Sequence, residues 1–268
     1  MPTILITGTS SGIGRATVKH FSSKDWNVVA TMRNTSDAGD LTEGALVLPL
    51  DVTVRDSIGK AVREAVDAFG SLDVVVNNAG YAVIGALEAV SADQIEQQFA
   101  VNVFGTMAMT QAVLPQFRTQ KGGTIVNISS IVGRFTYPLG AIYDASKFAI
   151  EGFSEAMRFE LEAIGAKIKI VEPGLISSDF GTRSMQFSHD PSLTAYQPLV
   201  DAMGAMAAKF TDMAEPADVV AEAVWQAATD GTDTLRYPAG QAALTALADR
   251  EKLDDLTFYA RTKERFGL

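Results

Sequence analysis

The chain alternates between short runs of apolar residues and longer stretches in which apolar residues recur every three or four positions. The runs are apolar at consecutive positions, which is typical of strands buried on both faces of a parallel sheet. We predict strands at Thr3–Thr7, Val28–Thr31, Ala45–Leu50, Leu72–Val76, Thr124–Ile128 and Lys167–Val171. The longer stretches predict amphipathic helices, among them Arg55–Phe69 and Tyr143–Ile164.

This alternation predicts the architecture. Strand-like runs that alternate with helical stretches are typical of a parallel sheet with helices on both faces. We expect a single α/β domain over residues 1–268, built as a Rossmann-type doubly wound parallel sheet. In such a sheet the ligand crevice lies beyond the carboxyl ends of the strands, so we look for candidate chemistry there.

Composition narrows the classes of function. The sequence is 47% hydrophobic and 20% charged, as expected for a globular protein. It contains no cysteine and two histidines, so we expect no disulfide, no thiol catalysis and no metal site. A net charge of −10 disfavours nucleic acid and anionic membranes as partners. No apolar stretch is long enough to span a membrane, and we expect a cytoplasmic protein.

A glycine-rich turn follows the first predicted strand and opens a helix. Free amides at a helix N-terminus, together with the helix dipole, favour a pyrophosphate. The glycines could instead serve only the geometry of the turn. Their place on the first strand-to-helix turn of a βαβ unit favours a dinucleotide site. We therefore assign to cofactor binding Gly8, Ser10, Ser11, Gly12, Ile13 and Gly14.

The second predicted strand leads to Arg33 and lacks an acidic residue that would bind an adenosine ribose. Arg33, with Ser11 and Arg15, could bind a 2′-phosphate, so we expect NADP(H) rather than NAD(H). The alternative is that Arg33 is a solvated surface residue. Asp51 and Val52 follow the third strand and could face the adenine, although Asp51 could equally cap the next helix.

A second set of residues carries candidate chemistry. Tyr143 and Lys147 stand four apart at the start of a predicted helix and share one face. Ser130 precedes the tyrosine by thirteen residues, and this spacing favours it over its neighbour Ser129. In order and spacing the chain resembles the short-chain dehydrogenase/reductase family. The resemblance covers most of the chain and rests on the glycine-rich turn, Asn77-Asn78-Ala79-Gly80, Asn102, Ser130, the Tyr143 and Lys147 pair, and Pro173-Gly174.

The resemblance implies hydride transfer between a nicotinamide and a carbonyl carbon. Tyr143 would act as acid and base at the oxygen, which requires its pKa to fall by about 2 to 3 from about 10. Lys147 would lower that pKa and bind the nicotinamide ribose, and Ser130 would hold the substrate oxygen. Asn102 would complete a proton relay, although it could simply satisfy a backbone carbonyl. Further cofactor contacts are implied for Asn78, Ala79, Gly80, Tyr143, Lys147, Pro173, Gly174, Ile176 and Ser178.

Two positions depart from the pattern of the family. Ser178 stands where the family has a threonine that contacts the nicotinamide amide, and it keeps the hydroxyl while losing the methyl group. Asp144 follows the tyrosine, where many members have a small residue. A helical neighbour points about 100° away, so we expect Asp144 to be solvated in the first turn, where it favours the helix dipole.

The substrate side is expected to be apolar. Residues 178–213 are the segment least like regular α/β structure, and their aromatic and methionine content favours a lid over the site, although single side chains could pack in the core. With Phe135, Tyr137 and Leu139 before the tyrosine, this predicts a bulky, uncharged ketone or aldehyde, or its alcohol. Residues 240–268 are expected to form a helical tail.

The apolar stretch Phe99–Phe117 predicts a helix buried against the sheet and against another subunit, so we expect a homodimer or homotetramer. Two other functions stay open. One is a non-catalytic NADP-binding regulatory protein, which would bind cofactor without turnover. The other is an alcohol dehydrogenase that acts oxidatively on steroid- or retinoid-like alcohols.

Overall fold

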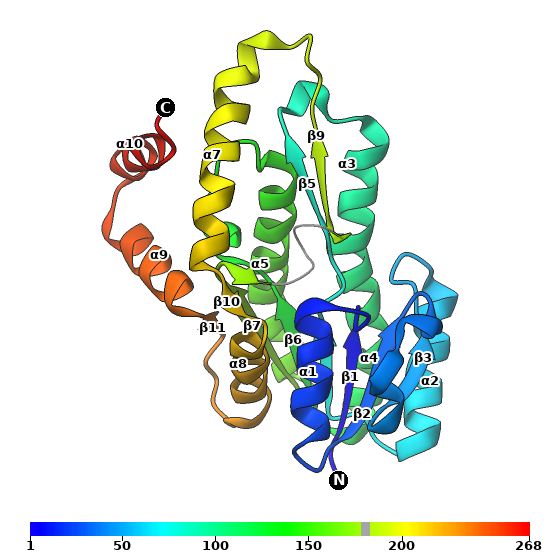
Figure 1. Ribbon diagram of the computed structural model, residues 1–268. Helices are drawn as coiled ribbons and strands as arrows, with labels where there is room; N and C mark the ends of the chain where they lie inside the picture. The colour runs from blue at the N-terminus through cyan, green and yellow to red at the C-terminus, as the bar shows by residue number, and fades with distance from the viewer. Residues whose placement is uncertain (178–182) are drawn as a thin grey trace.

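The computed structural model describes residues 1–177 and 183–268, and within these ranges seven parallel strands form one sheet (Figure 1). Their order is β11-β7-β6-β4-β1-β2-β3, so the chain winds outward from β1 in both directions. The strands are β1 Thr3–Thr7, β2 Asn27–Met32, β3 Leu46–Pro49, β4 Val74–Asn77, β6 Thr124–Ile128, β7 Lys167–Pro173 and β11 Arg236–Ala239. The predicted doubly wound α/β fold is confirmed.

Strand β11 is the one member of this sheet that the sequence pattern does not predict. It pairs with β7 in parallel and lies at the edge of the sheet. Its sequence, Arg-Tyr-Pro-Ala, lacks an apolar run and contains Pro238. An edge strand tolerates proline because its outer side forms no ladder hydrogen bonds. A strand of this kind therefore has too weak a signal to be recognised from the sequence.

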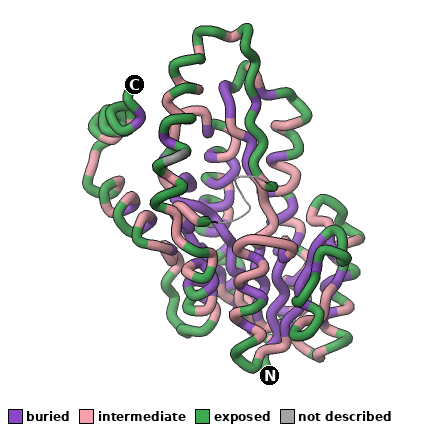
Figure 2. Tube along the Cα trace, viewed as in Figure 1, coloured by how far each residue is buried: buried purple, intermediate pink, exposed green. Residues whose placement is uncertain are grey.

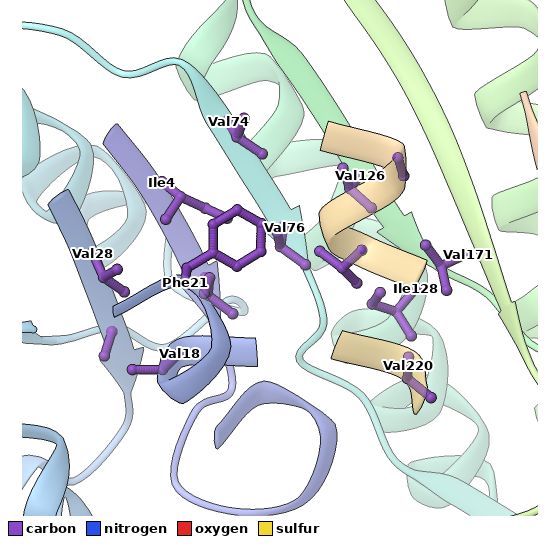
Figure 3. Packing of buried hydrophobic residues seen from close by; sticks show 14 of the residues in the cluster. Ile4, Val18, Phe21, Val28, Val74, Val76, Val126, Ile128, Val171 and Val220 are labelled. Atoms are coloured by element: carbon purple, nitrogen blue, oxygen red, sulfur yellow. The ribbon is translucent and has the colours of Figure 1, made fainter. Parts of the chain in front are cut away.

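Helices cover both faces of the sheet (Figure 2). On one face lie α1 Gly12–Ser22 and α8 Asp218–Thr229, and on the other lie α2 Arg55–Phe69, α4 Thr106–Gln120 and α5 Ala141–Glu162. Ile4 and Ile6 of β1 pack with Phe21 of α1, as Figure 3 shows for Ile4. Leu5 between them packs on the opposite face. Burial on both faces explains why the strands read as unbroken apolar runs.

Further elements extend beyond the carboxyl ends of the strands (Figure 1). They are β5 Ala82–Gly85, which pairs with β9 Met185–Ser188, β8 Ile176–Ser177, which pairs with β10 Glu215–Pro216, and the helices α3 Ala92–Phe99 and α7 Gln197–Met213. The expectation that residues 178–213 have little regular structure is wrong for their described part. Pro198 in the first turn and the Ala- and Met-rich sequence that follows favour α7.

The chain ends in two helices, α9 Gln241–Lys252 and α10 Asp255–Phe266. Asp254 caps α10, because its carboxylate accepts a hydrogen bond from Thr257 N at 2.8 Å. α10 contacts α7 through the rings of Phe266 and Phe210, whose centroids lie 6.2 Å apart. In the part of the chain that is described, no helix has the length and apolar character needed to cross a membrane.

Candidate active site

The glycine-rich turn lies at the carboxyl end of β1 and packs tightly against the segment after β4. Gly8 and Gly12 have φ of +70° and +54°, which favours glycine. A Cβ on Gly14 would lie 2.3 Å from Gly8 O, so no side chain fits there. The side chain of Asn78 donates to Thr7 O at 2.8 Å and to Gly8 O at 3.0 Å. Asn78 therefore holds the glycine-rich turn against the segment that follows β4.

The N-terminus of α1 is open toward this turn. Ser11 occupies the N-cap position, and among the described residues its side chain makes no capping hydrogen bond. The first amides of the helix therefore stay available to an acceptor. The glycines leave room at the turn because they have no side chains, and the free amides lie at the positive end of the helix dipole. Both features fit the pyrophosphate of a dinucleotide.

Arg33 and Arg15 have different surroundings. Arg33 is exposed just after β2. Arg15 instead donates to Ala38 O at 3.0 Å and pairs with Asp40, so it braces the loop of residues 37–40. These bonds engage the guanidinium of Arg15, which speaks against its expected contribution to a 2′-phosphate site. Arg33 remains the basic side chain that the site offers at this end.

Asp51 forms a turn rather than a helix cap. Its Oδ1 accepts hydrogen bonds from Thr53 N at 2.9 Å and Thr53 Oγ1 at 2.7 Å. The N-cap of α2 is Val54, three residues later. Val52 packs against Gly105, where a Cβ would lie 2.9 Å from Val52 Cβ. Val52 thus lies between the carboxyl ends of the strands and the segment that precedes α4.

Ser130, Tyr143 and Lys147 come together at the carboxyl end of β6. The Ser130 hydroxyl accepts from Val132 N at 3.3 Å and lies near enough to the side chain of Tyr143 to lower its pKa. Lys147, 8% exposed, donates to Ile128 O at 2.9 Å, and its Nζ lies 5.7 Å from the centre of the Tyr143 ring. The predicted juxtaposition of a serine, a tyrosine and a lysine is therefore present in the structure.

Burial shifts the pKa values of both titratable groups in this set. It raises the pKa of Tyr143, with the nearby Ser130 hydroxyl acting in the opposite direction and the charge of Asp144 in the same direction. It lowers the pKa of Lys147 to about 8, against the charge of Glu151. The predicted downward shift of the Tyr143 pKa is thus not produced by the protein alone. The raised pKa keeps Tyr143 protonated but makes it a weaker acid, so proton donation near neutral pH requires positive charge beside the phenol to lower its pKa.

Asn102 lies in a π-helical segment, Ala100–Gly105, between α3 and α4. Its side chain donates to Tyr81 O at 3.0 Å and to Ser146 Oγ at 3.1 Å, and it accepts from Tyr81 N at 3.0 Å. Ser146 in turn donates to Tyr143 O at 2.6 Å. Asn102 therefore ties the loop after β4 to the first turns of α5. Neither Ser146 nor the π-helical segment was distinguishable by sequence pattern from an ordinary amphipathic helix.

Asp144 is not solvated, and the expectation made for it is wrong. It is 2% exposed, and its Oδ2 accepts a hydrogen bond from Tyr137 N at 3.1 Å. Burial raises the pKa of this carboxyl to about 7, with the Tyr137 hydrogen bond acting in the opposite direction. The 100° step from Tyr143 turns the side chain toward the preceding loop instead of toward water.

A buried ionic cluster lies one helical turn beyond Lys147. Arg236 of β11 pairs with Glu151 of α5 at 3.0 Å, and Arg134 pairs with Glu172 of β7 at 3.2 Å. Burial and the nearby Glu151 raise the pKa of Glu172 to about 7. Sequence reasoning missed this cluster because its members come from four distant segments. The i+4 spacing from Lys147 to Glu151 was the available signal.

Aromatic side chains border the site on the side of α7 and α10. The ring of Tyr137 lies 5.3 Å from Phe135, 6.0 Å from Phe210 and 5.5 Å from Phe266. Met206 of α7 is buried, whereas Met185 and Phe187 of β9 are exposed. The apolar residues of 178–213 thus divide between a buried and an exposed group.

The loop after β7 lies between the candidate site and α9. Pro173 ends β7, and Gly174 N donates to Ala239 O at 3.0 Å. A Cβ on Gly174 would lie 2.8 Å from Ala243 N, so this backbone approaches α9 closely. Ile176 begins β8 and pairs with Glu215. Ser178 and Phe180, assigned to the cofactor and to the lid, lie outside the described residues.

Comparisons with known proteins agree with this geometry. Residues 2–188 match the family model for short chain dehydrogenase. An uncharacterized oxidoreductase of Schizosaccharomyces pombe is 41% identical over 226 residues, covering 84% of this chain and 94% of that protein. The 3-ketodihydrosphingosine reductase of Bacteroides thetaiotaomicron is 39% identical over 177 residues, covering 66% of this chain and 65% of that protein.

A solved structure extends the likeness to almost the whole chain. The crystal structure of a short-chain dehydrogenase from Streptomyces avermitilis superimposes with a TM-score of 0.84 at 28% identity, covering 99% of this chain and 97% of that one. The sequence matches and the shared fold indicate the same family as does the placement of Ser130, Tyr143 and Lys147. This chain belongs to the short-chain dehydrogenase/reductase family of oxidoreductases.

Proposed function

We propose that the protein is an NADP(H)-dependent oxidoreductase that interconverts a bulky, uncharged ketone or aldehyde and its alcohol. The observation that carries the proposal is the placement of Ser130 and the buried Lys147 next to Tyr143, at the strand ends that also hold the glycine-rich turn. The glycine-rich turn suits a dinucleotide, and Tyr143 offers a proton donor. Together these two features match an exchange of hydride and proton with a carbonyl group.

Each residue of this set has a distinct role in the proposal. Tyr143, held protonated by burial, donates its proton to the carbonyl oxygen during reduction and accepts one during oxidation. Ser130 holds the same oxygen through its hydroxyl. Lys147, with a pKa of about 8, is mostly protonated at pH 7, and its charge favours the phenolate that forms on proton transfer. A bound nicotinamide supplies or accepts the hydride.

Asn102 is proposed to act together with Ser130, Tyr143 and Lys147. Its side chain connects Tyr81 with Ser146, and the hydroxyl of Ser146 reaches the backbone of Tyr143. These bonds support a role in holding the start of α5 as well as in proton transfer. The proton relay implied by the family remains part of the proposal.

NADP(H) is proposed over NAD(H) because Arg33 directly follows β2, where an acidic residue would favour the ribose hydroxyl. An exposed guanidinium can bind a 2′-phosphate through two parallel hydrogen bonds. The family as a whole uses either cofactor. The described residues that we propose to hold the cofactor are Gly8, Ser10, Ser11, Gly12, Ile13, Gly14, Arg33, Asp51, Val52, Asn78, Ala79, Gly80, Tyr143, Lys147, Pro173, Gly174 and Ile176.

The bulky, apolar substrate is proposed from the walls of the site. The ring of Tyr137 contacts Phe135, Phe210 of α7 and Phe266 of α10, so aromatic rings border the reacting end. Rings of this kind favour apolar substrates, because burying apolar surface stabilises the complex. The relative from Bacteroides is named for a keto substrate, 3-ketodihydrosphingosine. We propose that α7 and the tail formed by α9 and α10 cover the substrate as a lid.

A homodimer or homotetramer is also proposed. Phe104 of the π-helical segment is 62% exposed, and Phe148 of α5 is 44% exposed. Large aromatic side chains on the outer surface of two neighbouring helices favour a contact between subunits. Sedimentation at micromolar concentration tests this, and a monomer would contradict it.

The experiment for the proposed function follows absorbance of the reduced nicotinamide. Purified protein is mixed with NADPH or NADH and a panel of bulky ketones, aldehydes and small hydrophilic keto acids. We expect faster loss of NADPH than of NADH, with bulky carbonyls preferred. Preference for small keto acids would contradict the pocket assignment. Binding of NADPH without turnover of any carbonyl, or of any alcohol with NADP⁺, would instead support the non-catalytic alternative. Turnover confined to steroid- or retinoid-like alcohols would support the oxidative one.

A further inference from the structure

Asp144 is a buried acid whose partner lies outside its own helix. Acids in the first turn of a helix usually face water and act through the helix dipole. Asp144 instead accepts a hydrogen bond from Tyr137 N at 3.1 Å and is 2% exposed. A buried carboxylate is costly unless it makes hydrogen bonds that compensate for lost hydration. The Tyr137 amide is therefore a specific partner of this side chain.

The loop between Tyr137 and Gly140 is shaped to meet this carboxylate. A Cβ on Gly140 would lie 2.7 Å from Asp144 Oδ2, so the acid occupies space that any other residue would fill. Asp144 N also donates to Gly140 O at 2.8 Å. Leu139 adopts a φ of +62°, and its carbonyl accepts from Gly85 N of β5 at 2.8 Å. The loop is thus fastened on one side to α5 and on the other to β5.

The same loop carries an aromatic wall of the proposed substrate pocket. The ring of Tyr137 contacts Phe210 of α7 and Phe266 of α10, and Arg265 of α10 lies 5.9 Å from its centre. Asp144 holds the backbone amide of this tyrosine and directly follows the proposed proton donor, Tyr143. One side chain therefore sets the distance between the proton donor and the wall against which a substrate would pack.

We propose that Asp144 is a positioning residue for substrate recognition: through its hydrogen bond to Tyr137 N it fixes the Tyr137–Gly140 loop against the start of α5 and thereby shapes the pocket for bulky carbonyl substrates. This inference rests on the proposed function. It assigns Asp144 no contact with the reacting atoms. The hydrogen bond, not the negative charge, carries the role.

The variants Asp144→Asn and Asp144→Ala separate these contributions. Asparagine keeps an oxygen acceptor of the same length, whereas alanine removes it. We expect the alanine variant to raise KM for bulky ketones about tenfold with kcat changed less than threefold, and the asparagine variant to stay within about twofold of wild type. A merely destabilised enzyme would lose kcat at unchanged KM. Asp218→Ala, an exposed first-turn acid of α8, is the control and should change neither constant.

A second readout does not depend on turnover. Hydrogen exchange of the Tyr137 amide should be at least tenfold faster in the alanine variant and unchanged in the asparagine variant. If the alanine variant does not fold, Asp144→Ser replaces it, because a serine hydroxyl is too short to reach Tyr137 N. An unchanged KM together with full protection of the amide would overturn the inference. An asparagine variant impaired as strongly as the alanine variant would do so too, since the charge would then be responsible.

These readouts also separate the inference from the proposed function. If wild type reduces no carbonyl, the proposed function fails, and exchange at Tyr137 still decides whether Asp144 holds the loop. If wild type is active and both variants match it in KM and in exchange, the inference alone fails.

Discussion

The two ends of the candidate site, the glycine-rich turn and the reacting end at Ser130, Tyr143 and Lys147, are built from different parts of the polypeptide. At the glycine-rich turn, the backbone makes the site: Gly8 and Gly14 leave no space for side chains, and the amides of α1 face outward. At the reacting end, side chains make the site, and each is held by another buried polar group. A backbone site depends on where glycines are placed, whereas a side-chain site depends on a network that distant segments complete. The two ends should therefore fail differently when they are altered.

The largest effect is expected at the backbone-built end. Gly14→Ala places a Cβ 2.3 Å from Gly8 O, which forces the turn to move. A displacement of about 1 Å at a binding site costs about a hundredfold, so we expect the Kd for NADPH to rise by about that factor. Fluorescence titration measures the Kd. Gly122→Ala, where the nearest atom is 3.9 Å away, is the matched control. Near-normal NADPH binding by the Gly14 variant would mean that the pyrophosphate lies elsewhere.

A smaller effect is expected from the exposed arginine at that end. Arg33→Ala removes the guanidinium that we assign to the 2′-phosphate, so KM for NADPH should rise about tenfold. KM for NADH should stay unchanged, because NADH has no such phosphate. Parallel initial-rate measurements with the two cofactors test this. Equal changes for both would show that Arg33 supports the fold instead of the phosphate.

At the reacting end, changes should act through pKa values. Glu151 raises the pKa of Lys147, so Glu151→Gln should lower it below about 8. Lys147 then loses its proton at lower pH, and the alkaline fall of kcat/KM should move to lower pH by about 0.5 to 1. Glu155→Gln is the matched control, because Glu155 also pairs with Arg236 but is exposed. An unchanged pH profile for Glu151→Gln would show that the buried ionic cluster does not set the pKa that controls catalysis.

The smallest effect concerns stability. The pKa of Asp144 is about 7 in the folded protein and about 3.9 in an unfolded chain, so its ionisation between pH 4 and 7 destabilises the fold. Asp144→Asn cannot ionise and should raise Tm at pH 8 by about 3 to 6 °C, with no difference from wild type near pH 4. Thermal unfolding at several pH values measures this, with Asp218→Asn as an exposed control. A lower Tm for Asp144→Asn at pH 8 would show that the ionised carboxylate stabilises the fold.

The same contrast explains how much could be predicted from the sequence. The strands and long helices follow from apolar periodicity, and the bounds of the six predicted strands, α2 and α5 shift by at most two residues. The helix expected over Phe99–Phe117 is instead divided between the π-helical segment and α4. The glycine-rich turn and the tyrosine and lysine pair have local signatures, so their positions could be named in advance. β11 could not, because an edge strand with a proline lacks an apolar run. Asp144 was misplaced for a related reason: its environment is set by Tyr137 and Gly140, which helical periodicity does not include.

The ionic cluster of Glu151 and Arg236 shows where such reasoning ends. These residues are 85 positions apart and meet only because β11 joins the sheet beside β7. The raised pKa of Tyr143 has the same origin, since burial in the folded protein is its largest cause and the charge of the adjacent Asp144 contributes less. Local motifs thus identify which residues take part, while the folded environment sets their protonation.

One measurement tests most directly whether chemistry and cofactor binding depend on different ends of the site. Tyr143→Phe keeps the ring and removes the hydroxyl that we assign as proton donor. We expect kcat for ketone reduction to fall by about a thousandfold while the Kd for NADPH stays within about twofold of wild type. Both quantities can be measured on the same preparation by absorbance and fluorescence. Retained turnover in this variant would contradict the assignment of Tyr143 and with it the proposed chemistry of the reacting end.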